Sequence, residues 1–407
     1  MNEKKVTLTI DGIQVVARAD ATIMEAAEIA GLCIPRLCYH SRLSEAGACR
    51  VCIVEVEGMK NFVPSCCTRV AEGMVVRTNS PDLLKARRDI VELLLDNHPE
   101  DCQTCARNGD CELQTLAQQF GIRERLYQGE RKHFPVDISS ASIVRDPDKC
   151  ILCGKCVRVC SEIQGVNALS FSHRGFRTNV GPAFDLPAAE SVCVNCGQCT
   201  LFCPTGALTE RDDTEKVWQA LSDPSKVVVV QIAPAVRVAL GEPFGFQPGT
   251  DLTGQTVAAL RRLGFDRVFD TQFSADLTIM EEAHELLHRL AHGGKLPMFT
   301  SCSPAWIKFC EHFHPDFLEN LSTCKSPQQM MGALIKTYYA RKQGLEAASI
   351  YSVSIMPCTA KKFEAARPEM KASSFQDVDA VLTTRELARM IKQAGLKFSE
   401  LKPEEFD

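Results

Sequence analysis

Two closely spaced runs of cysteine constrain this chain more than any other feature. Residues 150–160 read CILCGKCVRVC and residues 193–203 read CVNCGQCTLFC, so the pattern Cys-x2-Cys-x2-Cys-x3-Cys occurs twice. Two-residue spacers let consecutive thiolates converge on one iron–sulfur cubane, and the fourth cysteine of each run typically ligates the neighbouring cluster. We therefore expect two 4Fe-4S clusters, with the ligand sets Cys150, Cys153, Cys156, Cys203 and Cys160, Cys193, Cys196, Cys199. Zinc also takes four thiolates, but the doubled run favours iron.

The number and placement of cysteines exclude several other classes of protein. Seventeen of the 21 cysteines lie between Cys33 and Cys203, a clustering that indicates metal or redox centres in a reducing compartment rather than disulfides. The N-terminal residues include no apolar stretch of the kind that forms a signal peptide, and the most apolar run, 227–240, is too short to cross a bilayer. We expect a cytoplasmic protein with no membrane partner. A net charge of only -5 argues against nucleic acid as a partner.

A third group of cysteines lies in the first domain. Cys38, Cys49, Cys52 and Cys66 are separated by ten, two and thirteen residues, which places two thiolates in a tight loop and two on flanking segments. This arrangement suits a 2Fe-2S cluster, although the first spacer is longer than in plant-type ferredoxins, and zinc is the alternative. Cys33 and Cys67 are left over and are expected to pack as small apolar side chains.

A fourth group combines one imidazole with three thiolates. Its members are His98, Cys102, Cys105 and Cys111. On spacing alone, a zinc site and a 4Fe-4S cluster are equally compatible with this set.

The pattern of apolar and polar residues changes along the chain, and four domains are expected. Residues 1–80 alternate apolar and polar positions in four strand candidates, 6–10, 14–17, 51–57 and 75–78, around one helix that begins near Thr22. Pro81 opens a helix ahead of the His98 group, so we assign 81–140 to a small helical domain and 141–222 to the doubled cysteine runs. Residues 223–407 contain five strand-like runs between helical segments, which predicts a largely parallel sheet covered by helices. No GxGxxG or P-loop motif supports a nucleotide site.

The order of these motifs resembles that of multi-cluster iron-only (FeFe) hydrogenases and of the large iron–sulfur subunit of respiratory complex I. Two segments, FTSCSPAW at 299–306 and MPCTAKKFE at 356–364, are similar to two of the three hydrogenase active-site signatures. The resemblance implies an α+β multidomain chain: a β-grasp 2Fe-2S ferredoxin domain, a small domain in which His98 helps hold a 4Fe-4S cluster, a double 4Fe-4S ferredoxin domain, and one α/β lobe of a hydrogenase-like catalytic domain.

The resemblance also implies roles for residues of the second half. Cys302 matches the family's proton-carrying cysteine, Cys358 matches an iron ligand, and Lys361 matches the lysine that binds a cyanide ligand of the di-iron unit. Ser303 stands where the family has a second ligand cysteine, and serine oxygen is a hard donor that cluster iron does not prefer. The third signature is not reached before Asp407. We therefore expect only remnants of a hydrogen-converting site.

Other positions matched to the family's proton path are expected to have ordinary surface roles in this chain. Glu282, Glu285 and Arg289 are interpreted as one solvated helix face, on which Glu285 and Arg289 form an i,i+4 pair. Ser322 belongs to the same matched set. Lys361 is expected to be a surface lysine.

The leading functional hypothesis is an electron-relay subunit with one 2Fe-2S and three 4Fe-4S clusters. By resemblance, it belongs to a flavin-based, electron-bifurcating NAD(P)H/ferredoxin oxidoreductase, in an anaerobic setting. Flavin and NAD(P) are expected on partner subunits, and the partners are an NAD(P)H-oxidising flavoprotein, a further iron–sulfur subunit and ferredoxin. The alternative is the catalytic subunit, as a fragment, of an NAD(P)-linked FeFe hydrogenase. A redox-sensing module is a third possibility.

Overall fold

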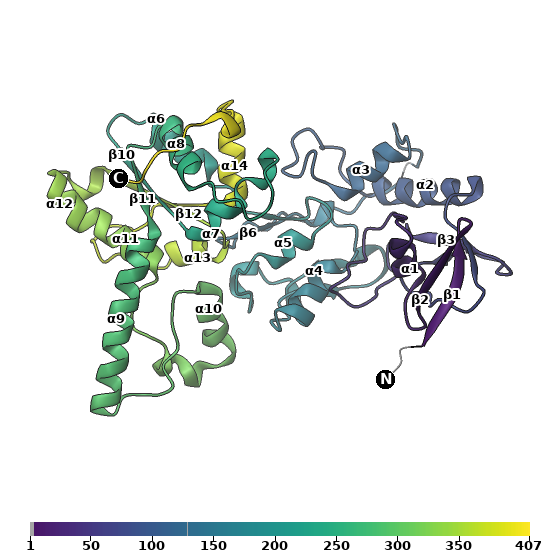
Figure 1. Ribbon diagram of the computed structural model, residues 1–407, viewed down its shortest axis with the longest axis horizontal. Coiled ribbons are helices and arrows are strands. Elements are labelled where there is room, and N and C mark those ends of the chain that lie inside the picture. Colours follow the sequence, from purple (N-terminus) through teal and green to yellow (C-terminus); the bar gives the residue numbers. More distant parts are fainter. Residues whose placement is uncertain (1–3, 128) are drawn as a thin grey trace. The chain divides into compact units, whose positions relative to one another are not determined.

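The computed structural model describes residues 4–127 and 129–407, which form two compact units (Figure 1). The first unit contains the described residues up to Ser139, with Val144–Ser191 and Gln198–Thr209. The second contains Ser140–Ile143, Val192–Gly197 and Glu210–Asp407. No helix in the described part of the chain is long and apolar enough to span a membrane.

The first unit begins with a five-stranded mixed sheet. Its strands are β1 (Lys5–Ile10), β2 (Ile13–Arg18), β3 (Ile53–Val56), β4 (Val63–Pro64) and β5 (Val75–Arg77), in the order β2-β1-β5-β3-β4. β1 runs antiparallel to β2 and parallel to β5, with Thr9 opposite Val75. The four strands expected from the sequence are present, and β4 is an addition of two residues.

One helix packs on this sheet because both elements bury their apolar sides. In β1, Val6, Leu8 and Ile10 alternate with more exposed residues, as a half-buried strand requires. They share a core with α1 (Ile23–Ile29). Thr22 caps α1 in a capping box with Glu25, so this N-terminus was predictable from the sequence.

Short helices complete the first unit. α2 (Pro81–Asp96) begins after the N-cap Ser80 and packs against α3 (Glu112–Gln119), which follows the His98 group. The doubled cysteine runs lead into α4 (Lys155–Arg158), continued by a π-helical turn over Val159–Ile163, and into α5 (Gln198–Phe202). Small sheets pair β6 (Ile143–Arg145) with β9 (Leu208–Glu210) and β7 (Ser170–Ser172) with β8 (Asn179–Gly181).

The second unit is built on a four-stranded parallel sheet. Its strands are β10 (Val227–Ile232), β11 (Arg267–Asp270), β12 (Ile350–Met356) and β13 (Ala380–Thr383), in the order β11-β10-β12-β13. Both faces of β10 are buried. Val228, Val230 and Ile232 enter one hydrophobic cluster, whereas Val229 enters another on the opposite face.

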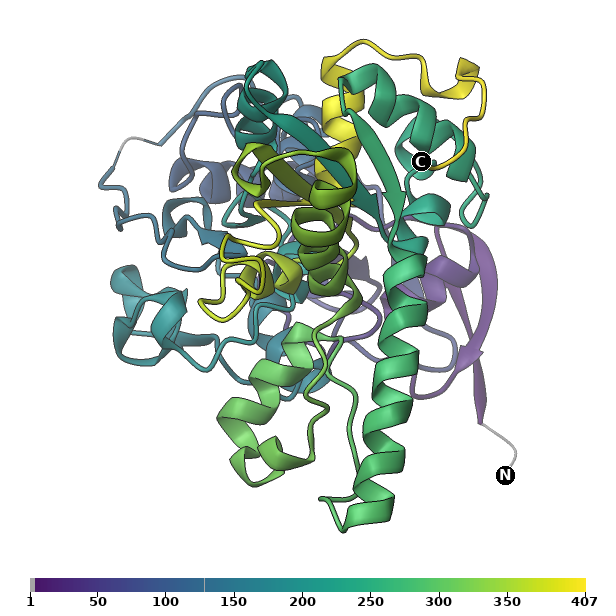
Figure 2. The same ribbon diagram turned by 90° about the vertical axis from the view of Figure 1, so that its left-hand side faces the viewer.

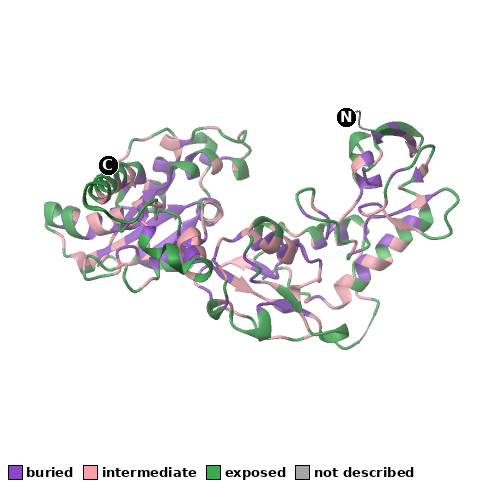
Figure 3. Cartoon of the chain, turned by 90° about the horizontal axis from the view of Figure 1, so that it is seen from below, coloured by how far each residue is buried: buried purple, intermediate pink, exposed green. Residues whose placement is uncertain are grey.

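Helices cover both faces of this sheet, and the buried residues follow it (Figure 3). The larger cluster receives residues of α6 (Thr214–Ser222), α7 (Pro234–Ala239), α8 (Thr253–Leu263) and α14 (Thr384–Gln393). The smaller cluster receives α11 (Pro327–Leu334) and the π-helical turn Ile335–Tyr339. The long helix α9 (Thr271–His292), green in Figure 2, packs against α11. Two further helices, α10 (Pro304–Phe313) and α13 (Ala360–Ala365), follow the two signature segments.

The expected fifth strand at residues 297–301 does not join the sheet. Its backbone groups are used by another segment: the Phe299 amide donates to the Asn320 carbonyl at 2.8 Å, and the Phe299 carbonyl accepts from the Ser322 amide at 2.7 Å. The result is one isolated bridge between Phe299 and Leu321. The apolar run was therefore misinterpreted as a sheet strand.

Candidate metal centre

The four cysteines of the predicted 2Fe-2S set are buried and connected through their sulfur atoms. Cys38, Cys49, Cys52 and Cys66 are each at most 6% exposed. The Cys52 and Cys66 Sγ atoms are 3.3 Å apart, and the Cys49 backbone amide donates to Cys38 Sγ at 3.4 Å. Cys38 and Cys52 both lie in the long loop that precedes β3. Cys66 follows β4. Four soft donors in one buried network fit a 2Fe-2S cluster.

Hydrogen bonding within this network sets the protonation of its thiols. Hydrogen bonding with Cys49 and then Cys66 lowers the pKa of Cys38 to about 2, and hydrogen bonding with Cys66 lowers the pKa of Cys52 to about 6. The pKa values of Cys49 and Cys66 are raised, in both cases chiefly by hydrogen bonding with Cys38. The network therefore lowers the pKa of two of the four thiols and raises that of the other two.

Cys67, which the sequence left unassigned, lies beside this network. Its Sγ is 3.4 Å from that of Cys66. A Cβ added at Gly47 would come within 3.0 Å of the Cys67 sulfur, so the loop approaches this cysteine closely.

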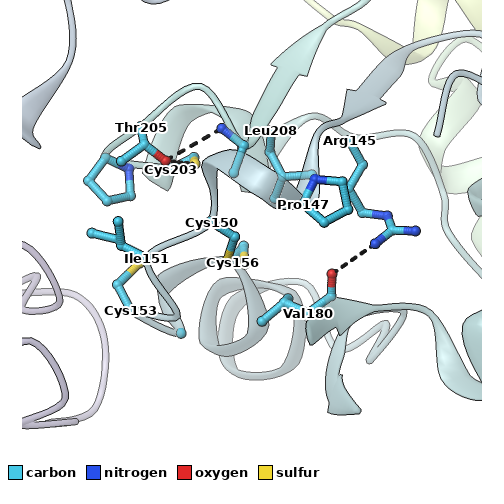
Figure 4. A pocket seen from close by; sticks show the side chains of 13 residues that line it. Arg145, Pro147, Cys150, Ile151, Cys153, Cys156, Val180, Cys203, Thr205 and Leu208 are labelled. Carbon is cyan, nitrogen blue, oxygen red and sulfur yellow. Dashed lines mark hydrogen bonds between the residues drawn. The ribbon is translucent and has the colours of Figure 1, made fainter. Parts of the chain in front are cut away.

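The first predicted 4Fe-4S set lines one small cavity of the first unit (Figure 4). Cys150, Cys153, Cys156 and Cys203 all contribute to its wall, together with apolar side chains and Arg145. Burial raises the pKa of Cys150 to about 11 and that of Cys153 to about 12. A free thiolate is thus costly here, and bound iron would supply the positive charge that stabilises it.

The two cysteine runs have the same local backbone shape. Leu152 and Asn195 occupy equivalent positions and have positive φ angles of 55° and 59°, and the glycines two residues later, Gly154 and Gly197, have φ angles of 70° and 74°. These left-handed turns direct backbone amides toward sulfur. The Leu152 amide donates to Cys150 Sγ, and the Asn195 amide donates to Cys193 Sγ, each at 3.4 Å.

His98 has the geometry of a ligand. Its side chain is 7% exposed, and Nδ1 donates to the Pro99 carbonyl at 2.9 Å. This bond fixes the tautomer, which leaves Nε2 as a bare acceptor. Among the described residues Nε2 is buried and has no hydrogen-bond partner. Burial also lowers the pKa of His98, which favours the neutral imidazole that binds metals.

The three cysteines of the His98 set are partly exposed, and two of them contact the segment beside the cavity of Figure 4. The Cys111 thiol donates to the Pro204 carbonyl at 3.6 Å. A Cβ added at Gly206 would lie 2.8 Å from Cys105 Sγ. Segment 203–206 therefore touches both predicted sites of the first unit. Cys102 is likewise partly buried.

The remaining set is divided between the units. Cys160 and Cys199 belong to the first unit, and Cys193 and Cys196 belong to the second, so this ligand set stays a prediction. Across residues 4–127 and 129–407, no three His, Cys, Asp or Glu side chains are grouped as a single-ion site requires. A multi-iron cluster separates its ligands by several iron and sulfide ions.

In the second unit, Lys361 is not the surface lysine that was expected. It is 9% exposed, and its ammonium donates to the Cys302 carbonyl at 2.8 Å and to Glu364 at 3.0 Å. Cys302 and Ser303 are exposed just before α10, and Cys358 is partly buried between β12 and α13. Lys361 thus connects the two signature segments because its charge is desolvated and needs both partners.

The residues matched to the family's proton path are also not a solvated helix face. The side chains of Glu285 and Arg289 are 15% and 11% exposed and form an ion pair. Ser322 Oγ donates to Glu285 at 2.9 Å, and Glu282 Oε1 is buried without a partner among the described residues. Burial would raise the pKa of Glu285, but hydrogen bonds from Arg289, Ser322 and Thr323 outweigh it and lower the pKa. The i,i+4 spacing was read correctly, but its burial was not visible in the sequence.

Known sequence families cover most of the chain. The 2Fe-2S iron–sulfur cluster binding domain matches residues 3–81, and the NADH-ubiquinone oxidoreductase-G iron–sulfur binding region matches 87–125. The 4Fe-4S dicluster domain matches 149–207, and the C-terminal domain of the iron-only hydrogenase large subunit matches 226–407. The chain is 53% identical to NADP-reducing hydrogenase subunit HndD of Solidesulfovibrio fructosivorans, over 98% of this chain and 70% of that protein.

The chain belongs to the iron-only hydrogenase large-subunit family. It is 40% identical to iron hydrogenase 1 of Clostridium pasteurianum, again over 98% of this chain and 70% of that protein. It is 39% identical to NADPH-Fe(3+) oxidoreductase subunit alpha of Geobacter sulfurreducens, over 51% of this chain and 24% of that protein.

Sequence reasoning did not single out two arginines at these sites. Arg145 lines the cavity of Figure 4, where its Nη1 donates to the Val180 carbonyl at 3.2 Å. Arg158 lies inside the first cysteine run and contacts the neighbouring loop. Its position between Cys156 and Cys160 was the available signal, but spacing rules read only the cysteines of such a run.

Proposed function

We propose that this chain is an iron–sulfur electron-relay subunit of an NAD(P)-linked oxidoreductase. One observation carries the proposal: cysteines of three predicted ligand sets share a single hydrophobic cluster. Cys38 and Cys49 of the 2Fe-2S set and Cys153 of the first 4Fe-4S set are buried members, and Cys111 of the His98 set packs against them. Sites that share one core are close enough for electrons to pass between them.

The residues of the chain define what each site can do. In the proposed assignment, Cys38, Cys49, Cys52 and Cys66 hold a 2Fe-2S cluster in a β-grasp domain. Three further sets hold 4Fe-4S clusters: His98, Cys102, Cys105, Cys111; Cys150, Cys153, Cys156, Cys203; and Cys160, Cys193, Cys196, Cys199. Such clusters accept and donate single electrons. The apolar surroundings exclude water, and the amide donors to Cys150 and Cys193 stabilise negative charge on sulfur.

The partners follow from electron counting. Pyridine nucleotides deliver electrons in pairs as hydride, whereas iron–sulfur clusters take them singly, so a flavin is needed between the two. The chain carries no dinucleotide fingerprint, and two relatives are named as subunits that act with NADP or NADPH. We therefore infer a cytoplasmic complex with an NAD(P)H-oxidising flavoprotein and a further iron–sulfur subunit. In its most specific form, the proposal is that the complex bifurcates electrons and passes them to ferredoxin.

Iron content tests the assignment. One 2Fe-2S and three 4Fe-4S clusters amount to about 14 iron atoms per chain. After anaerobic reconstitution, we expect this content without stoichiometric zinc. The variant Cys153→Ser should lose about four iron atoms, whereas Cys33→Ser, at an exposed cysteine outside every set, should lose none. Equal iron in both variants would contradict the assignment of Cys153.

Hydrogen conversion is the second candidate function, and the environment of Lys361 favours it. The buried contacts from Lys361 to the Cys302 carbonyl and Glu364 keep the two signature segments together. Ser303 argues against it, because the family's ligand cysteine is replaced there by a hard oxygen donor. We expect no hydrogen conversion by this chain. Infrared bands of iron-bound CO and cyanide, after expression with the maturation machinery, would establish the second candidate instead.

A further inference from the structure

The Arg158 side chain donates to the backbone of two different predicted ligand cysteines. Its Nη2 donates to the Cys38 carbonyl at 2.6 Å and to the Cys153 carbonyl at 3.3 Å. Cys38 belongs to the predicted 2Fe-2S set and Cys153 to the first 4Fe-4S set. One guanidinium group therefore bridges the peptide backbones of two candidate sites.

The other donors of Arg158 strengthen the same connection. Nε donates to the Gly154 carbonyl at 3.3 Å, and Nη1 donates to the Ser44 carbonyl. Gly154 lies on the side of the 4Fe-4S site, and Ser44 lies on the loop of the 2Fe-2S site. The guanidinium thus has two acceptors on each side, which matches the planar fork of this group.

The helix that carries Arg158 holds the loop at a second point. Glu162 lies four residues later, one helical turn along, and accepts from the Ser44 amide at 2.9 Å as well as from the Ser44 hydroxyl. Arg158 on α4 and Glu162 on its π-helical continuation, which carry opposite charges, therefore both form hydrogen bonds with Ser44 of the loop. Arg158 and Glu162 do not need each other as partners, because each has acceptors or donors on the loop.

We propose that Arg158 is a positioning residue that fixes the 2Fe-2S site against the first 4Fe-4S site and so sets their electronic coupling. The proposal rests on the proposed function, since it concerns two of the ligand sets assigned there. When one electron passes between these sites, one is reduced as the other is oxidised and no bond is made or broken. The rate of electron transfer then depends on the distance between the two sites and on the atoms between them. Arg158 influences both through its hydrogen bonds to the Cys38 and Cys153 carbonyls.

The test compares Arg158→Gln with Arg158→Lys in the reconstituted full chain. Glutamine removes the charge and most donors, whereas lysine keeps the charge without the fork. We expect both variants to keep wild-type iron content but to lose the magnetic interaction that broadens the 2Fe-2S EPR signal when the neighbouring 4Fe-4S site is reduced. Hydrogen exchange of residues 39–48 should become faster by about tenfold or more, because charge-assisted bonds to the loop are lost.

Arg174→Gln is the matched control, because Arg174 is an exposed arginine of the same unit with no side-chain hydrogen bond or ion pair to the described residues. It should leave coupling and exchange unchanged. Full restoration of coupling by lysine would overturn the positioning role and leave only a charge effect. If Arg158→Gln does not take up its clusters, Glu162→Gln is the deciding variant. It should speed up hydrogen exchange of residues 39–48 and weaken the magnetic coupling between the two sites. Unchanged coupling in Glu162→Gln would overturn the proposal.

The same experiment separates this inference from the proposed function. A wild-type chain without 2Fe-2S and 4Fe-4S signals would overturn the ligand assignment and the role of Arg158 with it. Normal wild-type signals with unaltered coupling in Arg158→Gln would overturn only the role of Arg158.

Discussion

Individual buried nitrogens and sulfurs of the first unit fit the ligand roles proposed for them. His98 is the clearest example, because its Nδ1 is occupied by the Pro99 carbonyl and its Nε2 is buried without a partner among the described residues. The cost of leaving a buried acceptor unpaired is about 1–3 kcal/mol, which binding to iron would remove. The sequence could propose His98 from its position before three cysteines, but the tautomer needed the structure.

Replacing His98 by cysteine should lower the reduction potential of its cluster. A thiolate adds negative charge where a neutral imidazole stood, and negative charge disfavours the reduced cluster, as the higher potentials of His-ligated Rieske centres illustrate. EPR-monitored titration of His98→Cys measures the change. His133→Cys is the control, because His133 is an exposed histidine paired with Asp148. An unchanged titration in His98→Cys would remove this residue from the ligand set.

Replacing Arg145 by glutamine should lower the potential of the cluster assigned to Cys150, Cys153, Cys156 and Cys203. Arg145 lines that cavity, and a positive charge beside it stabilises the added electron. The midpoint should fall relative to wild type while iron content stays the same. A midpoint that rises or does not move would show that the guanidinium is screened from the site.

Secondary-structure elements differ in how far the sequence determined them. Helix α1 was predictable because Thr22 and Glu25 form a local capping signal, and β10 was predictable because a run of valines is typical of a buried parallel strand. Residues 297–301 had a similar apolar run but paired with 320–322 instead. That choice depends on tertiary partners, which no local pattern contains. The burial of Lys361 and Glu285 was missed for the same reason.

Three elements of the second unit are held together by a buried charge. Lys362 on α13 donates to Asp213 before α6 and to Glu386 on α14, each at 2.9 Å. Lys362→Met should lower the free energy of unfolding of this unit by about 3–5 kcal/mol, because the buried Glu386 loses its ammonium partner and Asp213 keeps only Lys216. Both tryptophans, Trp218 and Trp306, lie in this unit, so denaturant unfolding followed by fluorescence measures it.

This destabilisation should depend on pH. Burial raises the pKa of Glu386 above its ordinary value of 4.5 even with the Lys362 ammonium present. Without that ammonium the pKa rises further. A carboxyl whose pKa is higher in the folded than in the unfolded protein lowers the free energy of unfolding as pH rises from the unfolded to the folded pKa. The destabilisation caused by Lys362→Met should therefore be larger at about pH 8 than at about pH 6. The exposed Lys371→Met is the control, and a pH-independent loss would contradict the assignment to Glu386.

At the scale of the whole molecule, the sequence motifs identified the family, whereas the division into two units crosses them. The second cysteine run is split, with Cys193 and Cys196 in the second unit and Cys199 and Cys203 in the first. A repeat motif reports which residues share chemistry. It does not report which compact unit each residue folds with, because that depends on long-range packing.

The whole chain should not oxidise NAD(P)H by itself. It lacks a dinucleotide fingerprint, and hydride must be split into single electrons on a flavin before clusters can accept them. Purified chain with viologen dye should show no nucleotide oxidation, whereas the native complex should contain flavin and show that activity. Rapid oxidation by the chain alone would contradict the inferred flavoprotein partner.

The shared hydrophobic cluster makes several segments of the first unit depend on one another. Leu37 and Val51 come from the first domain, Val91 and Leu113 from the helices that follow, and Cys153 from the doubled runs, yet all are buried together. A ferredoxin-like segment cut out at residue 80 would expose the apolar side chains that it contributes. These segments therefore depend on one another for burial, and removing one would leave apolar side chains of its neighbours exposed to water.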